Sequence, residues 1–161
     1  DTRLVWLANP NNPTGTWLPA ADVKAFVASV PPNVLVVLDE AYNEYLAPEQ
    51  QADTVSWLGG YPNLVISRTV SKAYGLAALR IGFGLMHADI AAMLNRVRQP
   101  FNVNALAQAA AIAALEDTDY VSRSQGLNRQ GMAQLEAGFA RQHHRQPVPV
   151  AALAQVVQHG R

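Results

Sequence analysis

Short apolar segments recur along the first part of the chain, each bounded by turn-forming or polar residues. They are too short for typical helices and rich in β-branched residues, a combination typical of buried strands. Because the apolar runs are continuous rather than alternating with polar residues, they indicate strands covered on both faces, as in parallel sheets. The predicted strands are residues 4–8, 34–38, 63–67 and 81–86.

Segments with a helical period of apolar residues fill the intervals between and after these strands. The first begins at Pro19, a favourable first residue of a helix, and ends before Pro31. Strands that alternate with helices predict an α/β fold, with a mostly parallel sheet and helices on both of its faces. Further helices are predicted over residues 53–58, 88–97, 105–115 and 120–141.

The composition excludes several classes of function. Hydrophobic residues make up 50% of the 161 residues and charged residues only 15%, against roughly 25% in average proteins, so much buried surface is expected. The 12 basic and 12 acidic residues balance, which leaves no excess charge for nucleic acids or acidic membranes. The chain has no cysteine, no apolar stretch of membrane-spanning length and no signal-like N-terminus, so a cytoplasmic protein is expected.

Polar residues follow three consecutive predicted strands, at the point where each strand ends. Asn12 lies in a proline-rich turn after the first strand, Asp39 and Tyr42 follow the second, and residues 67–72 follow the third. In an open α/β sheet, ligands bind just beyond the carboxyl ends of the strands. The three groups are therefore expected to converge on one crevice.

Each of these residues also has a purely structural interpretation. Asp39 could simply cap the turn that follows its strand, or its carboxylate could pair with a protonated ring nitrogen of a ligand. Lys72 could be a solvated surface lysine, or a neutral amine able to attack an aldehyde. The loop of Asn12 could be no more than a turn. Small hydroxyl residues before Lys72 and a following arginine, Arg80, favour a phosphate-bearing ligand.

Taken together, these segments resemble a known family. Residues 12–15 (Asn-Pro-Thr-Gly), 39–42 (Asp-Glu-Ala-Tyr) and 67–72 (Ser-Arg-Thr-Val-Ser-Lys), with Arg80, resemble in order and spacing the fold-type-I aminotransferases of class I and II. The similarity covers about residues 3–141. It implies that residues 1–117 are part of a large domain that binds pyridoxal 5'-phosphate (PLP), and that residues 118–161 form a long helix and the start of a small domain.

The resemblance also implies a role for each candidate. Lys72 would carry the cofactor covalently and later act as the general acid and base. Asp39 would pair with the pyridinium nitrogen, while Tyr42 and Asn12 would hydrogen-bond the phenolic oxygen. The Asn12–Pro13 peptide is expected to be cis. The cofactor phosphate would be held by Thr69, Ser71 and Arg80. The histidines match no role in this pattern and are expected on the surface: His87, His143, His144 and His159.

Within the family, residues 9–16, 71–82 and 99–104 look most like the histidinol-phosphate aminotransferases. This implies transfer of an amino group between glutamate and a phosphorylated imidazole keto compound, with amino-acid and keto-acid substrates and a homodimer. The alternatives are a threonine-phosphate decarboxylase, an aromatic aminotransferase, or a non-catalytic aminotransferase-like domain of a regulator. Residues 142–161 depart from the family pattern, and other expected site residues lie outside the chain, so the chain alone is expected to be incomplete and inactive.

Overall fold

A four-stranded sheet forms the centre of the molecule in the computed structural model, which describes residues 1–142. Its strands lie in the order β1 (Leu4–Ala8), β2 (Leu35–Asp39), β3 (Leu64–Thr69) and β4 (Gly82–Met86). The first three are parallel, and β4 runs antiparallel to β3. The predicted α/β class with a mostly parallel sheet is confirmed, and the predicted strand bounds differ from the observed ones by at most two residues.

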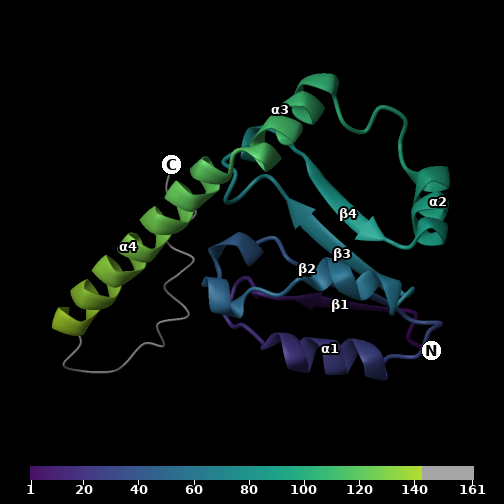
Figure 1. The fold of residues 1–161 in the computed structure, drawn as a ribbon, viewed down its shortest axis with the longest axis horizontal. Coiled ribbons are helices and arrows are strands. Elements are labelled where there is room, and N and C mark those ends of the chain that lie inside the picture. Colours follow the sequence, from purple (N-terminus) through teal and green to yellow (C-terminus); the bar gives the residue numbers. More distant parts are fainter. Residues whose placement is uncertain (143–161) are drawn as a thin grey trace.

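Residues 1–142 also form four α-helices and several short 3-10 helices. Helix α4 extends away from it (Figure 1). Residues 53–58 were predicted as an ordinary helix, and this is wrong in type: Asp53 caps a single 3-10 segment through the Ser56 amide, and Gly60 ends it. The α-helices are α1 (Ala20–Ser29), α2 (Ala88–Val97), α3 (Ala105–Glu116) and α4 (Thr118–Gln142), and the 3-10 helices are η1 (Asn43–Tyr45), η2 (Pro48–Gln50), η3 (Thr54–Gly59) and η4 (Ala77–Leu79).

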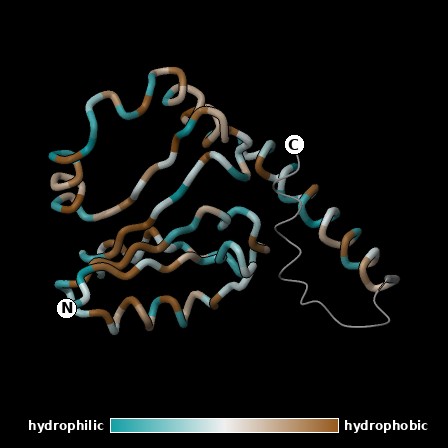
Figure 2. The backbone as a smooth tube through the Cα atoms, turned by 180° about the vertical axis from the view of Figure 1, so that it is seen from behind, coloured by the Kyte–Doolittle hydropathy of each residue, from teal (hydrophilic) through white to brown (hydrophobic). Residues whose placement is uncertain are grey.

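The two faces of the sheet bury different sets of side chains, because successive residues of a strand point to opposite faces. On one face, α1 and η3 cover the main core, which contains Val23, Val27, Val36, Leu38, Trp57, Leu64 and Ile66. On the other face, Ile90 of α2 packs against Val37 and Val65. The continuous apolar strands seen in Figure 2 therefore supply both packed layers, and the expected helices on both faces are confirmed.

Several large apolar side chains remain exposed. Trp6 of β1 is 60% exposed and Phe101, between α2 and α3, is 97% exposed. This agrees with the low fraction of charged residues. No helix among residues 1–142 combines the length and apolar character needed to cross a membrane. Of the four histidines, His87 is exposed at the start of α2; His143, His144 and His159 lie outside the described residues.

Candidate active site

The carboxyl ends of the three parallel strands lie side by side. Ala8, Asp39 and Ser67 are register partners across β1, β2 and β3. Backbone hydrogen bonds continue past the strand ends, since the Asn9 amide donates to the Asp39 carbonyl and the Glu40 amide to the Ser67 carbonyl, both at 2.9 Å. The segments that follow the three strands therefore start from one common edge, as the sequence predicts.

A pocket of ≈ 290 Å³ opens at this edge of the sheet. Its walls come from the segments after β1 and β2 and include three of the predicted site residues. The lining residues are Ala8, Pro10, Asn12, Asp39, Ala41 and Tyr42. A half-buried carboxylate, a phenol and a carboxamide thus face one small volume.

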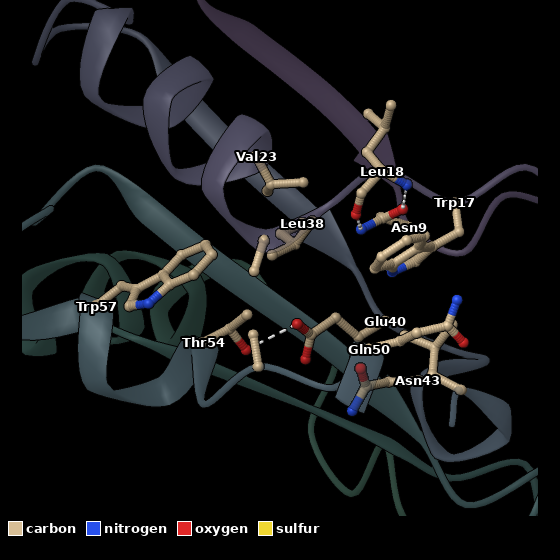
Figure 3. Close-up of a pocket in the computed structure, with 13 residues that line it drawn as sticks. Asn9, Trp17, Leu18, Val23, Leu38, Glu40, Asn43, Gln50, Thr54 and Trp57 are labelled. Atoms are coloured by element: carbon tan, nitrogen blue, oxygen red, sulfur yellow. Dashed lines mark hydrogen bonds between the residues drawn. The ribbon is translucent and has the colours of Figure 1, made fainter. Parts of the chain in front are cut away.

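Asn12 and Tyr42 are joined directly, although 30 positions separate them in the sequence. The Asn12 Nδ2 donates to the Tyr42 hydroxyl at 2.8 Å. The loop that carries Asn12 is closed by Asn9, whose side chain donates to the Leu18 carbonyl at 3.1 Å and accepts from the Leu18 amide at 2.8 Å (Figure 3). The predicted cis Asn12–Pro13 peptide is confirmed, and Asn9–Pro10 is cis as well.

Asp39 is half-buried, and its two carboxylate oxygens differ in their surroundings. Oδ1 accepts a hydrogen bond from the Ala41 amide at 3.1 Å, as a capping residue does. Within residues 1–142, no hydrogen bond reaches Oδ2. The capping interpretation and the ligand-pairing interpretation are therefore compatible, because each uses a different oxygen.

Lys72 lies on the same side of the sheet as this pocket. Its Nζ is 5.3 Å from the centroid of the Tyr42 ring. The turn that carries it is held by hydrogen bonds from the Gly75 amide to the Lys72 carbonyl at 2.9 Å and from Leu76 to Val70 at 3.0 Å. Gly75 has a φ of 72°, a conformation that residues with a Cβ rarely adopt. The structure thus brings together Asn12, Asp39, Tyr42 and Lys72.

The predicted phosphate ligands are less closely grouped. Thr69 Oγ1 accepts from the Ser71 amide at 3.1 Å and donates to the Ile81 carbonyl at 3.3 Å, so these two residues share one turn. Arg80 is exposed, has a left-handed φ of 54°, and its guanidinium donates to the Ala77 carbonyl at 2.8 Å. In the described chain, no hydrogen bond joins Arg80 to the other candidates, and its part in holding a phosphate stays a prediction.

Sequence reasoning missed an ion pair on the opposite face of the sheet from Asp39. Arg68 donates from Nε to Glu40 Oε2 at 2.8 Å, and its Nη2 lies 2.7 Å from the same oxygen. Thr54 donates to Glu40 Oε1 at 2.7 Å, as Figure 3 shows. The available signal was that Glu40 follows Asp39 in the strand direction and must point to the opposite, apolar face, where a carboxylate needs a partner.

A second missed pair joins the turn after β2 to the turn that carries Lys72. Tyr74 donates to Glu44 Oε1 at 3.5 Å. Burial raises the pKa of the Glu44 carboxyl, and the nearby Glu40 adds to this, while a backbone hydrogen bond, Arg68 and Tyr74 act in the opposite direction. Burial also raises the pKa of the Tyr74 phenol, with Glu44 contributing, so at neutral pH Tyr74 is the proton donor of the pair.

We expect Glu44→Gln to stabilise the fold at neutral pH but not in acid. Below the usual carboxyl pKa of 4.5, Glu44 is protonated in both the folded and the unfolded chain and carries no penalty. As the pH rises through the elevated folded pKa, the buried charge costs stability, and glutamine avoids that cost. Urea unfolding of both proteins from about pH 4 to about pH 8 measures the difference. A difference that is constant across this range would contradict the prediction, and Glu49→Gln on the neighbouring η2 is the control.

Residues 1–142 contain no group of three or more histidine, aspartate or glutamate side chains that could hold a metal ion. The candidate site is therefore described by its amine, its carboxylate and its hydrogen-bond donors. An amine close to a carboxylate and a phenol, at the carboxyl edge of a parallel sheet, is a set that can hold a ring with a basic nitrogen on one side and an aldehyde on the other.

Comparison with known proteins agrees with this interpretation. A family model described as aminotransferase class I and II matches residues 1–148. The chain is 64% identical over 141 residues to histidinol-phosphate aminotransferase 2 of Ralstonia nicotianae, covering 88% of this chain and 38% of that one. It is 63% identical over 140 residues to histidinol-phosphate aminotransferase 1 of Thiobacillus denitrificans, covering 87% and 36%. The chain thus spans less than two fifths of the length of these relatives.

Solved structures give the same result. The structure of histidinol-phosphate aminotransferase from Sinorhizobium meliloti in complex with pyridoxal-5'-phosphate superposes with a TM-score of 0.77 at 42% identity, covering 82% of this chain and 36% of that one. L-threonine-O-3-phosphate decarboxylase from Porphyromonas gingivalis gives a TM-score of 0.65 at 29% identity, covering 74% and 36%. The family resemblance seen in the three sequence segments is confirmed: the chain belongs to the aminotransferase class I and II family.

Proposed function

We propose that this chain forms the central part of a PLP-dependent aminotransferase that acts on histidinol phosphate and 2-oxoglutarate. The observation that carries the proposal is the grouping of Lys72, Tyr42, Asn12 and Asp39 at the carboxyl edge of the sheet. High identity to histidinol-phosphate aminotransferases supports the choice of substrate.

The residues present fit PLP in both size and chemistry. The pocket volume of ≈ 290 Å³ is near the lower end of the range of about 300–1,000 Å³ found for small-molecule sites. The free Oδ2 of Asp39 suits a protonated ring nitrogen, and the phenol and carboxamide of Tyr42 and Asn12 suit a ring oxygen. Lys72 supplies the amine to which an aldehyde is attached.

When bound, PLP supplies an electron sink for the carbanion formed at the substrate Cα. The protein side chains would hold the cofactor and move the protons. Asp39 keeps the proton on the ring nitrogen, because a carboxylate stabilises an adjacent positive charge. The Asn12–Tyr42 pair would hold the ring oxygen, and Lys72 Nζ would move a proton between the substrate Cα and the cofactor carbon. We assign the cofactor phosphate to Thr69, Ser71 and Arg80, whose Nη1 donates to the Ala77 carbonyl.

The larger organisation belongs to the same proposal. We assign residues 1–117 to the large PLP-binding domain, and residues 118–161 to the long helix and the start of the small domain. The enzyme is proposed to be a cytoplasmic homodimer. A threonine-phosphate decarboxylase and an aromatic aminotransferase are the alternative enzymes, since both would use the same cofactor residues. The identity to histidinol-phosphate aminotransferases favours the action on histidinol phosphate.

A hybrid enzyme tests the substrate assignment. In it, the matched residues of this chain replace the equivalent 141 residues of the Ralstonia nicotianae relative. We expect the hybrid to transfer the amino group of glutamate at a rate within about tenfold of the parent, because the two sequences are 64% identical over the exchanged residues. Amino-donor and acceptor profiling measures this. Activity confined to aromatic amino acids, or release of CO₂ from threonine phosphate, would contradict the assignment.

A further inference from the structure

The ion pair between Glu40 and Arg68 is the strongest polar cluster outside the candidate site. The side chain of Glu40 is 3% exposed and that of Arg68 is 22% exposed. Both carboxylate oxygens of Glu40 are engaged, Oε1 by Thr54 and Oε2 by two nitrogens of Arg68. The position of the Glu40 side chain is therefore fixed from two directions. The small cavity drawn in Figure 3 has a volume of only ≈ 20 Å³, enough for one water but for no larger ligand.

The two residues of the ion pair are direct sequence neighbours of site residues. Glu40 follows Asp39 at the end of β2, and Arg68 stands between Ser67 and Thr69 at the end of β3. Because side chains alternate along a strand, the pair occupies the face of the sheet opposite to Asp39. The Glu40 amide also donates to the Ser67 carbonyl at 2.9 Å. Side-chain and backbone contacts thus join the same two strand ends.

The contact between Glu44 and Tyr74 extends this connection to the next turns. Glu44 lies in η1, just after Tyr42, and Tyr74 lies two residues after Lys72. Gln125 of α4 donates to the Glu44 carbonyl and so holds the same turn from outside. The charge of Arg68 also lowers the pKa of the Glu44 carboxyl, against the larger effect of burial. The turns that carry Tyr42 and Lys72 therefore share one polar support.

Stability alone does not account for such a pair. Two apolar residues of similar volume often stabilise a protein as well as a buried ion pair does, because desolvation offsets the attraction between the charges. What the contact of two guanidinium nitrogens with one carboxylate oxygen adds is a defined geometry. Here that geometry sets the end of β2, which carries Asp39, and the end of β3, which leads into the turn of Lys72.

We infer that the Glu40–Arg68 ion pair is a positioning device for the cofactor site, which holds the end of β2 that carries Asp39 and the end of β3 that leads to Lys72 in the spacing that PLP requires. Neither Glu40 nor Arg68 lines the candidate-site pocket, so both act through Asp39 and Lys72. The inference rests on the proposed function.

The chain offers a direct measurement, because Lys24 and Lys72 are its two lysines. The 161-residue chain is treated with PLP and borohydride, and peptide mass spectrometry gives the ratio of label on Lys72 to label on Lys24 as a function of pH. In the test variant, Glu40→Gln with Arg68→Met, both charges are removed together so that neither is left buried alone. We expect the ratio to fall about 10- to 100-fold, the size of effect that a displacement of about 1 Å has on a reacting group. The pH profile of Lys72 labelling should also move toward that of Lys24.

Asn63→Ala is the matched control. Asn63 is 7% exposed and donates to the Val34 carbonyl at 2.8 Å, near the opposite ends of β2 and β3. Loss of this hydrogen bond should lower the melting temperature without altering the carboxyl ends of β2 and β3. The labelling ratio should therefore stay at the wild-type value. Arg68→Lys, which keeps the charge but loses the two-nitrogen contact with Glu40 Oε2, should give an intermediate ratio. If the double variant does not fold, this variant decides the question.

An unchanged ratio and pH profile in a folded Glu40→Gln/Arg68→Met chain would overturn the inference while the proposed function stands. A wild-type chain that labels Lys72 no faster than Lys24 would overturn both together. Circular dichroism at the labelling temperature establishes which variants are folded.

Discussion

Lys72→Ala is expected to abolish covalent attachment of PLP at position 72 and to lower turnover by the hybrid enzyme about 10⁵- to 10⁶-fold, the loss seen when a covalent nucleophile is removed. The physical reason is the position of the amine. Its Nζ lies near the Tyr42 ring at the edge of the pocket, where a bound aldehyde would meet it. The measurement is reduction with borohydride followed by mass spectrometry of the peptide that contains residue 72.

Two further variants separate the amine from its charge. Lys72→Arg keeps a cation over the Tyr42 ring but cannot give up its proton at neutral pH, so it should fail as completely as alanine. Lys24→Ala removes the other lysine, which lies on α1 with its Nζ 5.7 Å from the centroid of the Trp57 ring on η3. This variant should leave labelling at Lys72 unchanged. Full labelling that persists in Lys72→Ala would show that the amine was assigned to the wrong residue.

The fold could be predicted because its signals are local. The apolar runs of β1 to β3 are continuous, and a parallel sheet buried on both faces requires that pattern. The segment at 53–58 was predicted less well, because a capping aspartate followed by five residues and two glycines fits a short helical segment of either kind. Helix α4 was also found from its period, with bounds two residues wider at the start and one at the end than expected.

The site divides into parts that the sequence reveals and parts that it does not. Asn12, Asp39, Tyr42 and Lys72 follow consecutive parallel strands, and parallel strands bring such residues to one edge. The partner of Glu40 could not be inferred, because Arg68 is 28 positions away and the pairing depends on strand register. The direction of the Arg80 guanidinium depends on a left-handed backbone conformation that no local sequence pattern predicts.

Asp39→Asn is the second variant with a large expected effect, and it separates the two interpretations of this carboxylate. Asparagine retains an oxygen for the Ala41 amide and caps turns as well as aspartate does, so the free energy of unfolding should change by less than about 0.5 kcal/mol. It removes the negative charge that would face a protonated ring nitrogen. Loss of one member of a buried charge pair costs about 2–5 kcal/mol, so kcat/KM of the hybrid enzyme should fall by at least about 30-fold.

Asp39→Ala provides the comparison that makes the result decisive. Alanine removes the cap together with the charge, and it should therefore lose about 0.5–2 kcal/mol of stability in addition to the same loss of activity. Urea unfolding measures the first quantity and steady-state kinetics the second. If Asp39→Asn retains full activity while Asp39→Ala only destabilises the chain, Asp39 is a capping residue and the ring nitrogen has no partner on β2. If both variants lose activity but only alanine loses stability, the two carboxylate oxygens have the separate tasks that their surroundings indicate, one holding the turn and the other facing the ligand.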